Sequence, residues 1–306
     1  MLLSRSSSSP LFLLCLLFFI LHSPPGATAD SLYQICGNYG AYTTNRSHET
    51  QGNYTANSTY ETNLNLLLPD LVSNASLFGG YSSVMIGQFP NQTYGLALCR
   101  GDVNASLCHS CLETASQDIL QLCPYKIEAI VWYDDCLLHY SNLWSLGTTG
   151  DSEEILMYNI NNITTDRPLF EKLVDELLSA ITDRAANNAT MRFATGEVNS
   201  TETEFPTIYG LVQCTPDLWS SACRQCLQGI TDPQPSLFQG KQGARVLGLH
   251  CNYRYEIYKF YVGESMVKLG SRTPAPAPWV PPLAKPPAPW VPPPVNPGKG
   301  TKVASC

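Results

Sequence analysis

The cysteines of this chain recur with one fixed spacing, and this spacing limits the possible folds more than any other feature. A C-x8-C-x2-C motif that begins at Cys99 recurs at Cys214, and the next matched pair is Cys136 and Cys251. All these matches share one offset of 115 residues. The chain is therefore a tandem duplication with two domains of about 110 residues, a size that supports one hydrophobic core each.

The amino-terminal residues have the pattern of a secretory signal peptide. Arg5 supplies the positive charge, residues 11–21 form an apolar run, and residues 27–29 are small enough for cleavage. Because about 20 apolar residues are needed to cross a membrane, we expect secretion to the extracellular space and no membrane span. The expected division of the chain is a signal peptide at 1–29, a first domain at 30–146, a second domain at 147–265 and a Pro-rich disordered tail at 266–306.

Glycosylation sequons and net charge agree with an extracellular protein. Nine N-x-[ST] sequons are typical of a surface that is exposed to the glycosylation machinery. The formal charge of −7 and the absence of a basic run argue against nucleic-acid binding, which needs Lys and Arg to contact phosphates. The sequons lie at Asn45, Asn53, Asn57, Asn74, Asn91, Asn104, Asn162, Asn188 and Asn199.

The cysteine count differs between the two domains. The second domain has no counterpart of Cys36, and it has Phe238 at the position of Cys123. Loss of one bridge would remove both cysteines, which predicts a Cys36–Cys123 pair. The other four cysteines of each domain allow three pairings, and a direct Cys108–Cys111 bridge would be strained on a helix. Disulfides explain the cysteines better than a zinc or redox site, because each domain holds a single C-x2-C.

The hydrophobic pattern predicts an α+β fold, with two helices over an antiparallel sheet in each domain. An apolar stripe at spacing four predicts a helix at 168–186 that Asp166 caps, with a counterpart at about 60–72. A second helix, which carries C-x2-C, is expected to start near Asp102 in the first domain and near Pro216 in the second.

Strands are expected to follow these helices. Residues 251–257 alternate between apolar and polar, which predicts a strand with one buried face and one exposed face, and Glu256 falls on the exposed face. We expect Asp134 and Asp135 to lie at a solvated edge and to point to opposite sides, which disfavours joint acid–base catalysis. Hydrolase, kinase and phosphate-loop motifs are absent from the sequence. We therefore predict that the protein is not an enzyme and uses no cofactor or metal.

Proline dominates the end of the chain. Twelve prolines lie between Pro274 and Pro297, within a repeated A-P-W-V-P-P segment, which predicts an extended polyproline II stalk. A recognition motif is the alternative. Cys306 lies beyond the domains and has no expected partner, so we expect a reactive thiol or an intermolecular bridge there.

These motifs resemble the plant cysteine-rich repeat secretory proteins, which carry two ginkbilobin-homologous (stress-antifungal) domains. The resemblance rests on the cysteine motif and on the segments 243–247 and 253–256, and it covers about residues 31–262. The same domain pair forms the ectodomains of cysteine-rich receptor-like kinases and of plasmodesmata-located proteins. The resemblance implies the bridges Cys36–Cys123, Cys99–Cys108, Cys111–Cys136, Cys214–Cys223 and Cys226–Cys251.

Single-domain ginkbilobins are antifungal lectins that bind mannose through an Asn, an Arg and a Glu. The matching positions in the second domain are Arg245 and Glu256, with Asn159 as the candidate amide. A Glu accepts hydrogen bonds from sugar hydroxyls, an Arg donates them, and an Asn does both. The alternative is a cross-strand ion pair between Arg245 and Glu256. The first domain departs from the pattern at all three positions, which are Gly37, Ile130 and Ser141.

The resemblance implies a secreted, non-enzymatic binding glycoprotein of the plant apoplast that acts in stress or defence. One alternative is a weak mannose-binding antifungal lectin that acts through the second domain. Another is the truncated ectodomain of a cysteine-rich receptor-like kinase. The implied partners are cell-wall or fungal glycans, or an extracellular protein.

Overall fold

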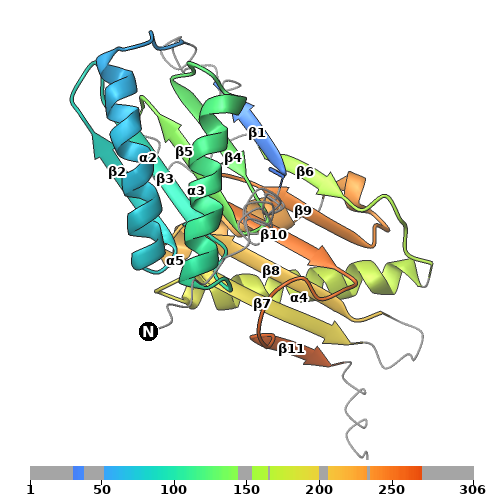
Figure 1. Ribbon diagram of the computed structural model, residues 1–306. Helices are drawn as coiled ribbons and strands as arrows, with labels where there is room; N and C mark the ends of the chain where they lie inside the picture. The colour runs from blue at the N-terminus through green and yellow to red at the C-terminus, as the bar shows by residue number, and fades with distance from the viewer. Residues whose placement is uncertain are drawn as a thin grey trace, which may run out of the picture. The chain divides into compact units, whose positions relative to one another are not determined.

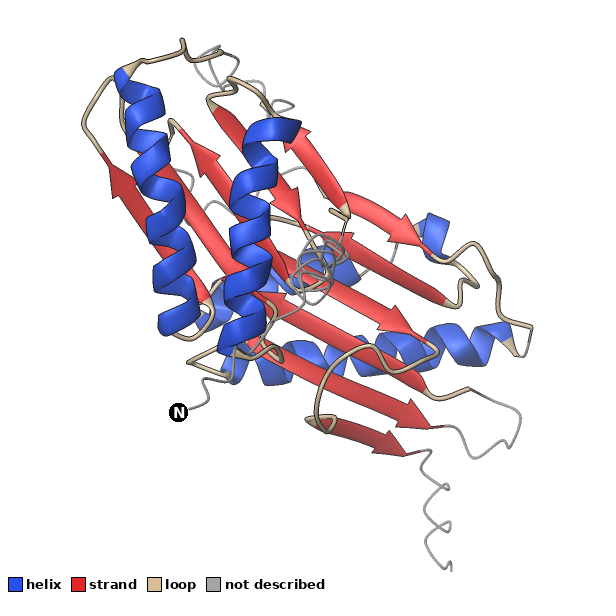
Figure 2. Ribbon diagram, viewed as in Figure 1, coloured by secondary structure: helices blue, strands red, loops and turns tan. Residues whose placement is uncertain are grey.

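A computed structural model shows each repeat as one sheet with two helices packed on one of its faces (Figures 1 and 2). This arrangement confirms the expected α+β class. The expected signal peptide, the sequon at Asn45 and the Pro-rich segment with Cys306 lie outside the described residues. The structure describes residues 30–37, 52–143, 154–164, 166–199, 206–232 and 235–270.

The first repeat has a five-stranded sheet in which all neighbouring strands are antiparallel, in the order β1-β4-β5-β3-β2. Figure 1 shows its two helices side by side over one face of this sheet. The strands are β1 (Tyr33–Cys36), β2 (Tyr81–Ile86), β3 (Thr93–Cys99), β4 (Glu128–Trp132) and β5 (Cys136–Ser141), and the helices are α2 (Thr59–Leu77) and α3 (Ala105–Leu122).

The second repeat has a six-stranded sheet in the order β11-β7-β8-β10-β9-β6. Its edge strand β11 runs parallel to β7, so this sheet is not fully antiparallel as we expected. The strand also continues the sheet past residue 265, where we expected the tail to have begun. The strands are β6 (Ile155–Tyr158), β7 (Phe193–Asn199), β8 (Ile208–Cys214), β9 (Gly243–Leu247), β10 (Cys251–Glu256) and β11 (Val267–Gly270), and the helices are α4 (Arg167–Asn187), α5 (Ser220–Thr231) and the short 3₁₀ helix η2 (Ser236–Phe238).

The two long helices confirm the prediction from hydrophobic spacing. The Asp166 carboxylate caps α4 by accepting a hydrogen bond from the Leu169 N–H at 3.1 Å. Ser58 caps α2 in the same way, through the Glu61 N–H. Both helices turn an apolar stripe toward their sheet, and no helix among the described residues is long and apolar enough to cross a membrane.

The helices that carry C-x2-C begin later than we expected. The Asn104 side chain accepts a hydrogen bond from the Leu107 N–H at 2.9 Å, so α3 begins after Asn104 rather than near Asp102. In the second repeat the Leu218 N–H first closes a turn on the Thr215 carbonyl. This turn delays the start of α5 beyond Pro216.

Glycines in the central strands let each long helix approach its sheet closely. A Cβ atom on Gly95 in β3 would overlap Leu67 and Leu71 of α2. A Cβ on Gly210 in β8 would likewise press against Leu177 of α4. The equivalent contact in both repeats shows that the helix–sheet packing was preserved after duplication.

Five disulfides join the helices and strands, in the pairs that the family resemblance implies. In the first repeat Cys99 lies directly opposite Cys136 on adjacent strands, and both bond to α3, at Cys108 and Cys111. The second repeat has the same arrangement with α5. The bridges are Cys36–Cys123, Cys99–Cys108, Cys111–Cys136, Cys214–Cys223 and Cys226–Cys251.

We predict that the double variant Cys226→Ser/Cys251→Ser loses about 3 kcal/mol of unfolding free energy, because the bridge closes a loop of 25 residues. Urea unfolding of the secreted protein, together with its secreted yield, measures the effect. Cys306→Ser is the control and should leave unfolding unchanged. Unchanged stability of the double variant, or free thiols at Cys108 and Cys111 on alkylation, would contradict this prediction.

Candidate functional site

The expected sugar-binding residues lie on the face of the second sheet that points away from its helices. Strands β9 and β10 are antiparallel neighbours, and Arg245 lies directly opposite Arg254. Tyr253 and Tyr255 alternate with Arg254 and join the core under α4 and α5. Arg245, Arg254 and Glu256 therefore share the other face of the sheet.

Arg245 is bound by a residue of the first repeat. Its Nη1 donates to Asp134 Oδ1 at 2.6 Å, and the Arg245 side chain is only 15% exposed. Arg254 lies beside it, with its Nη1 3.5 Å from the same oxygen of Asp134. Asp134 therefore accepts from two guanidinium groups of the second repeat. The Asp134 side chain is still 52% exposed, in agreement with the predicted solvated edge, but this edge also binds the second repeat, which the prediction did not include.

Glu256 is buried, which corrects the prediction that it lies on an exposed face. Its Oε1 accepts a hydrogen bond from Arg254 Nε at 3.1 Å and forms an ion pair with Arg254 Nη2 at 3.0 Å. Gly243 lies opposite on β9, and any side chain there would overlap the Glu256 carboxylate. The second oxygen, Oε2, has no hydrogen-bond partner among the described residues. Glu256 therefore keeps one free acceptor, which is shielded from solvent.

Asn159 follows the edge strand β6 and lies beside the neighbouring strand β9. Its backbone N–H donates to the Gly243 carbonyl at 2.8 Å, and its side-chain oxygen accepts from the Asn161 N–H at 2.9 Å. Within the described residues, no hydrogen bond or ion pair joins Asn159, Arg245 and Glu256 to one another. The expected cross-strand pair between Arg245 and Glu256 is therefore absent, since each has a different charged partner.

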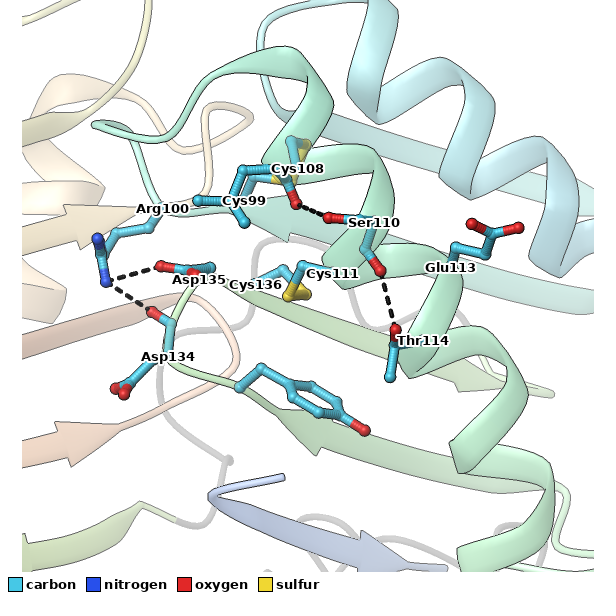
Figure 3. The surroundings of a disulfide bond; sticks show 12 residues. Cys99, Arg100, Cys108, Ser110, Cys111, Glu113, Thr114, Asp134, Asp135 and Cys136 are labelled. Carbon is cyan, nitrogen blue, oxygen red and sulfur yellow. Dashed lines mark hydrogen bonds and ion pairs between the residues drawn. A yellow bond between two sulfur atoms is a disulfide. The ribbon is translucent and has the colours of Figure 1, made fainter. Parts of the chain in front are cut away.

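A second set of ion pairs surrounds Arg100 in the first repeat. Its Nε binds Asp102 Oδ1 at 2.5 Å, and its Nη1 lies 3.0 Å from Asp135 Oδ1. The same Nη1 donates to the Asp134 backbone carbonyl at 3.1 Å. Figure 3 shows Arg100, Asp134 and Asp135 beside the cysteines of the two α3 bridges. We call Arg100, Asp102, Asp134, Asp135, Arg245, Arg254 and Glu256 the inter-repeat cluster.

The pKa values of Asp134 and Asp135, two members of the inter-repeat cluster, are shifted in opposite directions. Burial alone would raise the pKa of Asp134, but Arg245, helped by Arg254 and Arg100, outweighs this effect and lowers the pKa below its ordinary value. Burial raises the pKa of Asp135; Arg100 opposes this, while the adjacent carboxylates of Asp134 and Asp102 add to it. Asp134 is therefore the residue whose charge the arginines stabilise.

Apolar contacts and buried amide hydrogen bonds complete the joint between the repeats, which belong to one compact unit. Leu96, Ile130 and Trp132 of the first repeat form one cluster with Leu247 and Leu249 of the second. Hydrogen bonds also cross between the repeats: Gln213 Nε2 donates to the Cys99 carbonyl at 3.0 Å, the Gly101 N–H donates to Gln213 Oε1 at 3.3 Å, and Trp132 Nε1 donates to the Gly248 carbonyl at 3.3 Å.

Sequence reasoning missed Arg100 and Arg254 and did not bring the other members of the inter-repeat cluster together, although a signal for the cluster exists. At the offset of 115 residues, Arg100 corresponds to Thr215, and Asp134 corresponds to Leu249. Arg254 corresponds to His139. Charged residues that occur in one copy only are the ones expected where two copies face each other through different surfaces. The chemistry of these guanidinium–carboxylate pairs is that of a structural joint.

Eight of the nine sequon asparagines lie in the described part of the chain, and most are exposed. Two of them use the side-chain nitrogen that would carry a glycan. Asn74 Nδ2 donates to Asp70 Oδ1 at 3.0 Å, and Asn188 Nδ2 donates to the Phe193 carbonyl at 3.3 Å.

The histidines, cysteines and carboxylates of the described residues form no group of three that could hold a metal ion.

The salt stress response/antifungal family matches both repeats, at residues 45–143 and 158–258. Cysteine-rich repeat secretory protein 38 of Arabidopsis thaliana is 41% identical over 221 residues, which cover 72% of this chain and 86% of that protein. An antimicrobial ginkbilobin-2-like protein of Castanea crenata is 38% identical and is covered over 89% of its length, with 76% of this chain.

Receptor proteins share the same region. Cysteine-rich receptor-like protein kinase 10 of Oryza sativa subsp. japonica is 38% identical over 83% of this chain, which spans only 38% of the kinase. Among solved structures, the tandem DUF26 ectodomain of a cysteine-rich receptor-like protein from Arabidopsis thaliana has a TM-score of 0.60 at 23% identity. The match covers 75% of this chain and 98% of that ectodomain, and it supports the fold.

We predict that Asp134→Asn flattens the acid side of the stability profile. A carboxylate with a lowered pKa contributes stability above its ordinary value of about 3.9, and this stability is lost as the pH falls through the folded-state pKa. Melting temperatures between about pH 6 and pH 2 measure the loss, which should be steeper in the wild type than in the variant. Glu264→Gln, at an exposed ion pair with Lys268, is the control. Identical profiles for wild type and Asp134→Asn would exclude a role for this pair.

Proposed function

The chain belongs to the salt stress response/antifungal family of cysteine-rich repeat proteins, and from this we propose that it is a secreted, non-enzymatic binding protein of the plant apoplast that acts in stress or defence. The names of its relatives support this function, since one is a secretory protein and another is antimicrobial. The expected limits of the first domain, 30–146, and the start of the second at 147 remain part of this proposal, while the second domain extends through β11 to Gly270.

We further propose that the two repeats bind their partner as one rigid unit. The observation that carries this proposal is the 2.6 Å contact between Arg245 of the second repeat and Asp134 of the first. The family's sugar-binding arginine position is here used to hold the repeats together. A partner would therefore meet a surface to which both repeats contribute, and an extracellular protein or an extended cell-wall glycan fits such a surface.

Mannose binding through the second repeat is the alternative function. Glu256 Oε2 favours it, because this oxygen could still accept a hydrogen bond from a sugar hydroxyl. Against it, Arg245 would have to leave Asp134, and the Asn159 oxygen is already used by Asn161. Such a site would be weak, on the order of millimolar or about −4 kcal/mol.

A receptor ectodomain is a further alternative. It draws support from the 83% of this chain that matches a rice receptor-like kinase. The genomic sequence that follows the codon of Cys306 tests this alternative directly. An open reading frame with a membrane span and a kinase domain would favour the receptor.

We predict that Arg245→Ala destabilises the protein by about 1 kcal/mol, because it removes a largely buried side chain and its ion pair with the half-exposed Asp134. Thermal unfolding measures this loss, and a glycan array should show no mannose binding by the wild type. Arg167→Ala is the matched control, because Arg167 pairs with Glu171 on the exposed face of one helix and should contribute little.

The opposite result would support the lectin. In that case the wild type binds mannose on the array, and Arg245→Ala and Glu256→Ala abolish binding while the melting temperature stays unchanged. This combination would contradict a structural role for Arg245. It would support a sugar-binding function for the second repeat.

A further inference from the structure

Phe89 and Ile160 are the two most exposed large apolar side chains of the described residues, slightly ahead of Trp219. Phe89 is 87% exposed and Ile160 is 85% exposed. Both lie two residues before a sequon asparagine, Phe89 before Asn91 and Ile160 before Asn162. A single exposed apolar side chain is common on protein surfaces and by itself indicates no cover. What Phe89 and Ile160 share is their position next to a glycan attachment site. This shared position suggests that the chain's own glycan covers them.

The Phe89 site has a well-defined backbone. Phe89 and Pro90 occupy the corner of a turn that the Asn91 N–H closes on the Gln88 carbonyl at 2.9 Å. Pro90 restricts its own φ angle and so stiffens the turn. Residues two apart in a chain are at most about 7 Å apart between Cα atoms, which is within reach of a sugar ring attached to Asn91.

Helix α2 holds this turn in place. Asn63 Nδ2 donates to the Asn91 carbonyl at 2.7 Å. The Asn63 side chain also lies against Gly87, which has a φ of +83° and no room for a Cβ atom. The backbone position of Asn91 is therefore held by a contact outside the turn.

The Asn91 side chain is available for a glycan. Unlike Asn74 and Asn188, its Nδ2 donates no hydrogen bond to any described residue. Thr93, the third residue of the sequon, is fully buried at the start of β3. Attachment therefore has to precede closure of the β2–β3 hairpin. In that step Asn91 Nδ2 forms a bond to C1 of the N-acetylglucosamine of a lipid-linked sugar donor, the C1–O bond to the pyrophosphate breaks, and the lipid pyrophosphate leaves while Nδ2 gives up one proton.

We propose that Phe89 is the stacking platform for the first sugar of an N-glycan on Asn91. One face of a pyranose ring presents C–H groups, which are apolar and slightly positive. The face of a phenyl ring is apolar and slightly negative, so the two faces attract each other as the rings of an aromatic pair do. The glycan covers an otherwise exposed ring and ties the two sides of the turn together.

Ile160 offers the same position without a π face. It can pack against a glycan on Asn162 through apolar contact alone. The pair Ile160–Asn162 therefore provides a comparison within the same chain. Trp219 provides a second one, because it is an aromatic residue that is 81% exposed and has no sequon beside it in the sequence.

A double-mutant cycle on the protein secreted from plant cells tests the proposal. The four proteins are the wild type, Phe89→Ala, Asn91→Gln and the double variant, and glycopeptide mass spectrometry measures occupancy of Asn91. A contact as strong as an aromatic pair corresponds to a melting temperature shift of about 2–4 °C. We expect Phe89→Ala to cause this shift when Asn91 carries its glycan, and to cause little change in the Asn91→Gln background.

Two controls separate stacking from a general loss of stability. Trp219→Ala should change the melting temperature equally with and without the Asn91 glycan. The cycle on Ile160 and Asn162 should give a smaller coupling than the cycle on Phe89 and Asn91. In the proton NMR spectrum, sugar C–H signals of the Asn91 glycan should move upfield relative to those of the Phe89→Ala variant, because they lie over a ring.

Three results would overturn the proposal. The first is an equal effect of Phe89→Ala in both backgrounds at full occupancy of Asn91. The second is an unoccupied Asn91 while other sequons carry glycans. The third is the absence of glycans from all nine sequons, which would also contradict the proposed secretion and so is distinguishable from the second.

Discussion

Each repeat depends on a pair of disulfides that attach one helix to two opposed strand ends. Cys99 and Cys136 face each other across β3 and β5, and they bond to Cys108 and Cys111 on α3. Residues three apart lie on the same side of a helix. The C-x2-C spacing therefore presents two sulfur atoms to two neighbouring strands at once, which sets the position of the helix along the sheet. The second repeat keeps this arrangement with α5.

The same strand ends position the joint between the repeats. Arg100 follows Cys99 directly, and Asp135 precedes Cys136, so both charged residues are held beside bonded cysteines (Figure 3). Asp134 is one residue further and accepts from Arg245 of the other repeat. The bridges thus limit the motion of the groups that form the ion pairs. This restriction fixes the backbone from which these side chains extend, so less backbone entropy is lost when the ion pairs form.

Local sequence patterns predicted the fold class and the long helices, because hydrophobic spacing and capping act within one segment. The Asp166 cap and the alternation of β10 are examples. The environment of Glu256 was not predictable in this way. Alternation correctly places it on the face away from the helices, but whether that face is exposed depends on what covers it. Here the Arg254 guanidinium binds Glu256, and its Cζ lies 4.3 Å from the centroid of the Phe260 ring, which belongs to a segment outside the strand. The alternation within β10 gives no information about that segment.

The second repeat also shows how a domain of this family can lose a bridge and keep its core. Phe238 stands at the position of Cys123, and it is 2% exposed. Its ring lies 6.5 Å from that of Tyr253 and 6.4 Å from that of Tyr158, and the Tyr255 hydroxyl donates to its carbonyl. An aromatic cluster therefore occupies the place where the first repeat has a covalent bond. A bridge acts mainly by restricting the unfolded chain, whereas the cluster stabilises only the folded one. The two repeats thus keep a similar fold by different means. The bridge of the first repeat destabilises the unfolded state, and the aromatic cluster of the second stabilises the folded state.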